Sequence, residues 1–137
     1  MEHLALNGGV KIRKKPFPKH PIIGDEEKRQ VLEVLESGNI STFIASPGEN
    51  FLGGKKIREF ENKFAKKIGT TYGVAFNSAT SALHAAVVAV GVLPGEEVIV
   101  PPYTFTSTAT CALMHNAIPV FCDVKKDTYC LDPAKLE

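Results

Sequence analysis

Two early segments of the chain repeat apolar residues at the spacing of an α-helix. The first begins at Asp25, which can serve as its N-cap, and runs to about Ser37, with Gly38 just past its end. Its apolar face consists of Val31, Leu32, Val34 and Leu35. The second is expected over residues 55–68, and Gly69 ends it. Its apolar face consists of Ile57, Phe60, Phe64 and Ile68.

After residue 70 the pattern changes to short apolar runs that alternate with helical segments. Strands are expected over residues 72–76, 97–100 and 118–124, and helices over residues 80–91 and 104–115. This alternation predicts an α/β fold, with layered helices on a mainly parallel sheet.

Residues that favour turns separate these elements. Pro94-Gly95 precedes the second strand, and Asn116 follows the last helix, where a left-handed residue is favoured. Near the end, Asp132 can cap a new helix with Pro133 in its first position. Because that element begins without being completed, we expect the chain to be the N-terminal portion of a longer protein.

Two stretches are expected to be irregular. Residues 1–23 alternate basic residues with prolines, which predicts an extended arm that is either a solvated tail or lies across a partner subunit. Residues 24–137 then form the domain that the chain enters. Within it, residues 39–53 form a loop long enough to suggest a function. Its Phe43 and Phe51 either cover a ligand or pack against another chain.

Composition excludes several classes of protein. The 137 residues fit one domain or part of a larger one, and a net charge of +1 does not favour nucleic acid or an anionic membrane as a partner. No apolar run approaches the roughly 20 residues of a membrane span, and the N-terminus lacks a secretory signal. The odd number of cysteines indicates reduced, mostly buried thiols in a cytoplasmic protein, one of which could be reactive: Cys111, Cys122 and Cys130.

Common nucleotide and metal motifs are missing. The turn Asn77–Thr80 has none of the glycines of a Rossmann site, and Gly54 stands where a P-loop that begins at Gly48 needs lysine. The histidines have no zinc-like spacing with one another or with the cysteines, so no metal site is expected. His84, inside an alanine-rich segment, is expected to be a packed or surface residue.

The sequence does indicate a phosphate site where the strand at 72–76 meets the next helix. Small hydroxyl residues follow the strand directly, at Ser78, Thr80 and Ser81. The first backbone N–H groups of a helix have no intrahelical partner, and the helix dipole adds partial positive charge there. This corner is therefore predicted to bind a phosphate group.

An aromatic segment follows the second expected strand. Ligands of open α/β sheets bind beyond the carboxyl ends of the strands, so Tyr103 and Phe105 are expected at the same edge as the phosphate corner. A flat ring beside a phosphate site suits a planar phosphorylated cofactor. The alternative is that Phe105 is a core residue at the top of a helix.

Four ordered blocks of the sequence resemble the DegT/StrS-type sugar aminotransferases. They are Asn77–His84, Pro94–Pro101, Tyr103–Phe105 and Ile118–Val124. The resemblance extends from about residue 20 to 137. It implies the fold type I of pyridoxal-phosphate enzymes, of which this chain would be the N-terminal part of the large, cofactor-binding domain.

The resemblance also implies roles for particular residues. Thr80 and Ser81, with the backbone near Ala79, would hold the phosphate of pyridoxal 5′-phosphate, and Phe105 would stack on its pyridine ring. The enzyme would move an amino group from an amino-acid donor, commonly glutamate, to a keto-sugar nucleotide. It would be a homodimer with its site near the interface, and the loop at 39–53 would lie near the sugar nucleotide.

No catalytic residue is expected within this chain. In the family, the lysine that forms a Schiff base with the cofactor lies well downstream, so the 137-residue polypeptide should not transaminate alone. Later strands of the family's sheet would also be missing as neighbours of residues 72–76. Three alternatives stay open: a sugar dehydratase in which histidine replaces that lysine, an aminohydroxybenzoate synthase acting on a cyclic ketone, and a non-catalytic protein that binds the cofactor in regulation or assembly.

Overall fold

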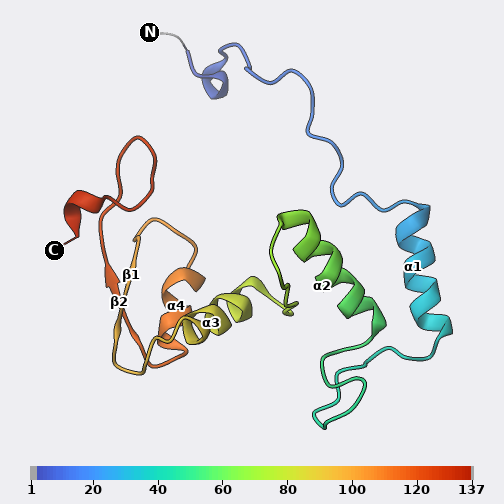
Figure 1. The fold of residues 1–137 in the computed structure, drawn as a ribbon. Helices are drawn as coiled ribbons and strands as arrows, with labels where there is room; N and C mark the ends of the chain where they lie inside the picture. Colours follow the sequence, from blue (N-terminus) through green and yellow to red (C-terminus); the bar gives the residue numbers. More distant parts are fainter. Residues whose placement is uncertain (1–2, 137) are drawn as a thin grey trace. The chain divides into compact units, whose positions relative to one another are not determined.

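The computed structural model describes residues 3–136 and divides at Leu52 into two compact units. The first contains a 3₁₀ turn, Ala5–Asn7, and helix α1, Asp25–Glu36. The second contains the remaining elements (Figure 1), which are α2, Lys55–Ile68; α3, Ala79–Ala89; β1, Glu97–Val100; α4, Ser107–Leu113; β2, Ile118–Phe121; and a 3₁₀ turn, Pro133–Lys135. No helix in the described residues is long and apolar enough to cross a bilayer.

In the first unit, α1 begins one residue later than its sequence suggests. Gly24 is the N-cap, and its N–H donates to Glu27 Oε2 at 2.7 Å. The prediction of Asp25 as N-cap is therefore wrong. Asp25 is the first helical residue, and its carboxylate pairs with Lys28 at 3.0 Å. A carboxylate here is favourable because the start of a helix carries partial positive charge.

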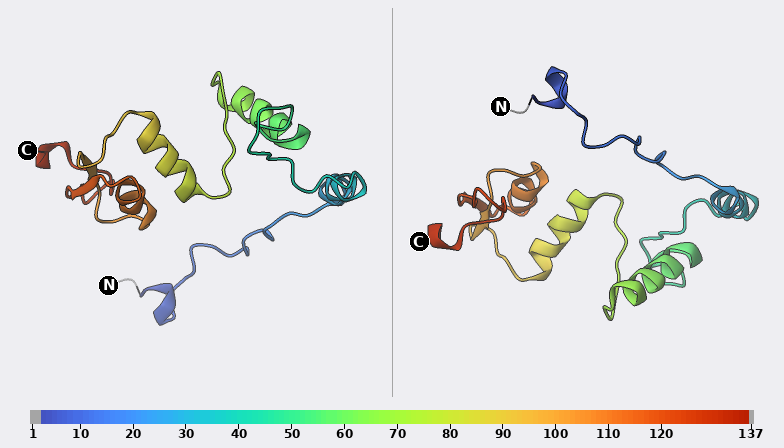
Figure 2. Two further views of the ribbon diagram at one scale, coloured as in Figure 1. Left: turned by 90° about the horizontal axis from the view of Figure 1, so that it is seen from below. Right: turned by 90° about the horizontal axis from the view of Figure 1, so that it is seen from above.

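The second unit is organised around a parallel pair of strands. β1 pairs with β2 from Glu97↔Ile118 to Val100↔Phe121, and α4 connects them. α4 contacts both strands, and α3 packs on α4 (Figures 1 and 2). The strand–helix–strand unit with a parallel sheet confirms the predicted α/β class.

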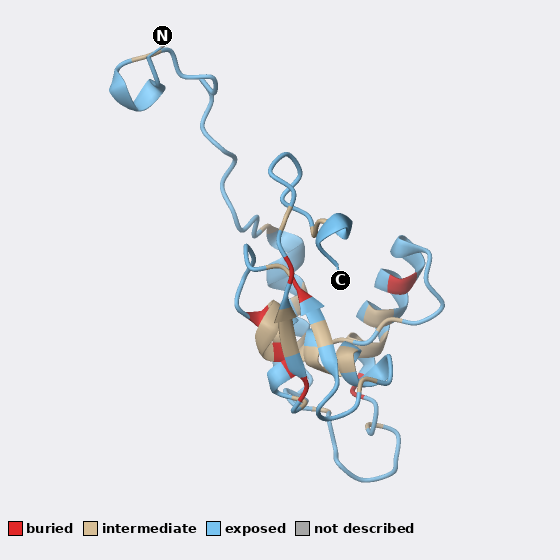
Figure 3. Ribbon diagram, turned by 90° about the vertical axis from the view of Figure 1, so that its left-hand side faces the viewer, coloured by how far each residue is buried: buried red, intermediate tan, exposed pale blue. Residues whose placement is uncertain are grey.

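The buried core of this unit lies between the strands and α4. Its apolar members are small or medium-sized: Val100, Cys111, Ala112, Ala117 and Cys122. Figure 3 shows these buried positions on the strands and on the helix beside them. Two of the three cysteines are thus buried as expected, whereas Cys130 is exposed.

The expected strand at residues 72–76 is not a strand. The segment is extended but pairs with no other strand in the described residues; instead it lies along α2. The N–H of Ala75 donates to Glu61 Oε1 at 2.8 Å. Gly73 lies so close that a Cβ there would be 2.8 Å from the Glu61 carbonyl oxygen. An isolated strand has no partner for its backbone groups, so the helix supplies one.

Other boundaries differ by a few residues. β2 ends at Phe121 rather than 124, and α4 starts at Ser107 rather than 104. The predicted turn residues have the expected geometry. Asn116 has φ 56° after α4, and Gly69 has φ 81° after α2. Asp132 Oδ1 accepts from the Ala134 N–H at 3.1 Å, although the element it caps is only a 3₁₀ turn.

The contact of residues 73–76 with α2 makes a first prediction. Gly73→Ala would place a Cβ against the Glu61 carbonyl and separate the segment from the helix. The bond from Ala75 to a carboxylate contributes about 1.5–3 kcal/mol, so its loss should speed amide hydrogen exchange at Ala75 by roughly 10-fold or more. Gly48→Ala is the matched control, because no atom lies within 4 Å of the added Cβ. Equal exchange at Ala75 in the two variants would contradict the contact.

Candidate cofactor site

The first turn of α3 forms the centre of the candidate site. Ser78 is the N-cap in an extended conformation, with φ −157° and ψ 156°. Its Oγ accepts from the Ser81 N–H at 3.1 Å and donates to Ser81 Oγ at 2.9 Å. Serine is among the best N-cap residues, which explains why the helix starts here. The predicted residues Ala79, Thr80 and Ser81 are therefore brought together in one turn.

This turn retains groups that suit an anion. None of the described residues accepts a hydrogen bond from the backbone amides of Ala79 or Thr80. No acidic residue occupies the first turn of α3, which is 11 residues long. Thr80 and Ser81 are half-buried, and Ala79 is exposed. Unpaired amides, hydroxyls and the helix dipole together fit a phosphate group.

The aromatic part of the candidate site follows β1. Phe105 and Tyr103 are 77% and 72% exposed. The carbonyl of Phe105 accepts from the Thr108 N–H at 3.0 Å, so this residue leads into α4. The alternative of a core Phe105 is therefore wrong. An exposed ring at the carboxyl end of a strand is available to stack on a planar ligand.

α3 and α4 are joined at the opposite edge of the sheet. His115, just after α4, hydrogen-bonds through Nε2 to the Val92 carbonyl at 2.8 Å, and its ring lies 6.1 Å from that of His84. The N–H of Gly95 donates to the Asn116 carbonyl at 2.8 Å, next to the start of β1. Both helices thus end at the amino edge, and their first turns point away from it. His84 is packed between helices, as expected.

Phe105 and the first turn of α3 nevertheless remain on separate elements. No hydrogen bond or ring contact joins them within the part of the chain that the structure describes. The structure thus supplies two parts that suit the two ends of a phosphorylated, planar ligand, without a direct link between them.

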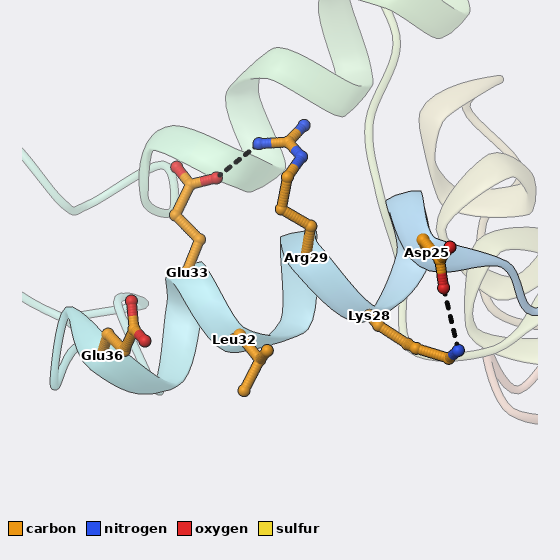
Figure 4. Close-up of a pocket in the computed structure, with 6 residues that line it drawn as sticks. All are labelled: Asp25, Lys28, Arg29, Leu32, Glu33 and Glu36. Atoms are coloured by element: carbon orange, nitrogen blue, oxygen red, sulfur yellow. Dashed lines mark hydrogen bonds and ion pairs between the residues drawn. The ribbon is translucent and has the colours of Figure 1, made fainter.

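Two hollows lie elsewhere. One of about 210 Å³ is lined by residues of α2 and the segment after it, among them Phe60, Phe64 and Phe76. The larger, of about 590 Å³, covers one face of α1 (Figure 4). Its charges pair within the helix: Arg29 reaches Glu33 at 3.7 Å, and a hydrogen bond to Glu26 raises the pKa of Arg29. Neither hollow contains a predicted site residue.

Comparison with known proteins identifies the family. Residues 21–137 match the DegT/DnrJ/EryC1/StrS aminotransferase family. The chain belongs to this family. It is 44% identical over 117 residues to the spore coat polysaccharide biosynthesis protein SpsC of Bacillus subtilis, covering 85% of this chain and 27% of SpsC. It is also 36% identical over 134 residues to the L-glutamine:scyllo-inosose aminotransferase of Streptomyces griseus, covering 98% of this chain and 30% of that enzyme.

The structure agrees with the sequence comparison. The fold superposes on 3-amino-5-hydroxybenzoic acid (AHBA) synthase with a TM-score of 0.75 and 35% identity, covering 88% of this chain and 29% of that one. The chain thus corresponds to part of a fold type I enzyme and spans about 30% of the length of the relatives it matches. The cofactor of these aminotransferases is pyridoxal 5′-phosphate. The α3 turn and the exposed ring of Phe105 fit its phosphate and its pyridine ring.

Residues 122–132, after β2, contain a feature that the sequence did not reveal. Tyr129 has φ 57°, and its ring lies 5.5 Å from that of Tyr103. No signal could have found it, because tyrosine rarely adopts a left-handed backbone.

The cap of α3 makes a second prediction. Ser78→Ala removes the acceptor for the Ser81 N–H and should destabilise α3 by about 1 kcal/mol. Ser78→Asp keeps an acceptor and should preserve the helix. Amide exchange over α3 measures both effects. Exchange that is equally slow in Ser78→Ala and the unchanged chain would show that the cap does not fix the start of α3.

Proposed function

We propose that this chain is the N-terminal part of a pyridoxal-phosphate enzyme that transfers an amino group from an amino-acid donor to a keto-sugar nucleotide. The membership in an aminotransferase family carries this proposal. The relative SpsC, named for polysaccharide biosynthesis, supports a sugar as acceptor. Glutamate is the donor we propose, and glutamine is the alternative that the name of the Streptomyces relative suggests.

In this proposal the chain's own residues bind and orient the cofactor. The amides of Ala79 and Thr80 and the hydroxyls of Thr80 and Ser81 bind the phosphate. Phe105 covers one face of the pyridine ring and limits its tilt. When bound, pyridoxal phosphate supplies the electron sink for amino transfer. The protein contributes position, charge and exclusion of water.

The loop at residues 39–53 supplies part of the sugar-nucleotide site across a dimer interface in this proposal. Phe43 and Phe51 are 58% and 52% exposed in the unit that carries them. Exposed aromatic side chains are common where a partner or a ligand covers them. The oligomeric enzyme would be a homodimer.

A second acceptor class is a cyclic ketone that is not attached to a nucleotide. The similarity to the scyllo-inosose aminotransferase and to AHBA synthase favours it. A dehydratase of the same family and a non-catalytic protein that binds the cofactor differ in the residue at the position of the Schiff-base lysine.

A chimera tests whether this segment forms a working cofactor site. The chain replaces the matching segment of the Streptomyces griseus enzyme, and amino transfer is measured with L-glutamine and L-glutamate as donors and with scyllo-inosose and a keto-sugar nucleotide as acceptors. We expect an active, cofactor-loaded chimera. Thr80→Val and Ser81→Ala should each weaken pyridoxal-phosphate binding about 10-fold, since each loses a hydrogen bond to a charged group.

Thr71→Val is the matched control, because Thr71 is an exposed hydroxyl residue outside the α3 turn. It should bind the cofactor like the unchanged chimera. A folded chimera whose cofactor affinity is the same in all three variants would overturn the assignment of the α3 turn. Activity with only one acceptor would decide between the two substrate classes.

The 137-residue polypeptide by itself makes a separate prediction. We expect no amino transfer when it is purified and supplied with pyridoxal phosphate, either donor and either acceptor, because the lysine that would move protons at the substrate is proposed to lie beyond this segment. Chromatographic detection of the aminated product is the measurement. Turnover by the polypeptide alone would show that its own residues suffice.

A further inference from the structure

A pair of tyrosine rings joins the two loops at the carboxyl edge of the sheet. Tyr103 belongs to residues 101–106, which follow β1, and Tyr129 belongs to residues 122–132, which follow β2. Their ring centroids are 5.5 Å apart, with an interplanar angle of 41°. Figure 1 shows both loops beyond the same ends of the two strands. The ring pair therefore bridges neighbouring loops on the side of the sheet that carries Phe105.

The loop after β2 holds Tyr129 in an unfavourable backbone conformation. The N–H of Tyr129 donates to the Lys125 carbonyl, and the N–H of Lys125 donates to the Cys130 carbonyl, both at 2.9 Å. An antiparallel bridge between Val124 and Leu131 closes the loop. Tyr129 has φ 57°, a region that a bulky L-residue occupies only when its surroundings require it. Such positions cluster at functional sites.

The loop after β1 has few other attachments at this point. Pro101 and Pro102 have no backbone N–H, and the backbone of residues 101–104 makes no hydrogen bond with any described residue. Further on, Thr104 Oγ1 lies 2.9 Å from Thr108 Oγ1, and the Phe105 carbonyl accepts from Thr108. Phe105 is thus held from one side by α4, and Tyr103 is held from the other side by Tyr129.

The ring pair adds little to the core. Tyr103 is 72% exposed and Tyr129 is 62% exposed, so their contact is at the surface. We propose that Tyr129 is a positioning residue: through its ring contact with Tyr103 it orders residues 101–105 and so presents Phe105 to the cofactor. This inference rests on the proposed role of Phe105.

The ordering can be measured without cofactor in the 137-residue chain. Tyr129→Asn removes the ring but keeps a residue that tolerates positive φ, so the loop after β2 can still close. Backbone ¹⁵N order parameters of Tyr103, Thr104 and Phe105 should fall from about 0.85 to below about 0.6. Tyr129→Phe should keep them near their original values. Unchanged order parameters in Tyr129→Asn would overturn the proposal.

Near-UV circular dichroism gives a second readout. The chain has three tyrosines and no tryptophan, so its signal near 280 nm reports mainly on tyrosine rings. Tyr129→Asn should remove at least half of it. Tyr72→Phe is the control, since Tyr72 is 83% exposed and pairs with no aromatic ring in the described residues. A loss as large in Tyr72→Phe as in Tyr129→Asn would contradict the ring pair.

The consequence for the cofactor is tested in the chimera. Tyr129→Asn should weaken pyridoxal-phosphate binding by the same factor as Phe105→Ala, about 10-fold, and Tyr129→Phe should restore it. If Phe105→Ala has no effect, the proposed role of Phe105 fails, whatever the order parameters show. If Phe105→Ala weakens binding and Tyr129→Asn does not, Tyr129 is not a positioning residue.

Discussion

The parallel pairing of β1 with β2 is the constraint on which the arrangement of the candidate site depends. With Val100 opposite Phe121, the two strands end together, so the loops that follow them emerge at one edge. A parallel pair needs a crossover, and α4 supplies it. The buried residues, among them Val100 and Ala112, are those that this crossover presses against the strands. Phe105 and the Tyr103–Tyr129 pair are at the carboxyl edge because of this topology.

Much of the apolar surface outside this unit is uncovered. Phe60 and Phe64 of α2 are 57% and 51% exposed, and residues 72–76 have one polar contact with α2 in place of a neighbouring strand. In the aminotransferase family the chain accounts for about 30% of the full length. We infer that the candidate site takes its local shape from caps and turns rather than from a large core. The Ser78 cap and the strained Tyr129 backbone are the clearest cases.

The chemistry proposed for the site follows from a division of labour between two kinds of group. Backbone amides and hydroxyls at the start of α3 are suited to a charged phosphate, because they are fixed donors near a helix dipole. An exposed aromatic ring is suited to a flat heterocycle, because contact between the two faces excludes water. These groups bind pyridoxal phosphate in the proposed enzyme, and the cofactor supplies the reaction. Small shifts of either group would therefore affect cofactor binding first.

The sequence by itself determined the elements whose signals are local. The helical starts and ends at Ser78, Gly69 and Asn116 depend on one residue and its nearest neighbours, and the ordered blocks around them identified the family and its cofactor. The strand at 72–76 was predicted wrongly, because a strand exists only when another strand pairs with it. Asp25 was placed one residue too early, because the Glu27 side chain competes for the cap. Only the tertiary structure decided that Phe105 is exposed and that Tyr129 adopts a left-handed backbone against Tyr103, since both depend on contacts between segments distant in sequence.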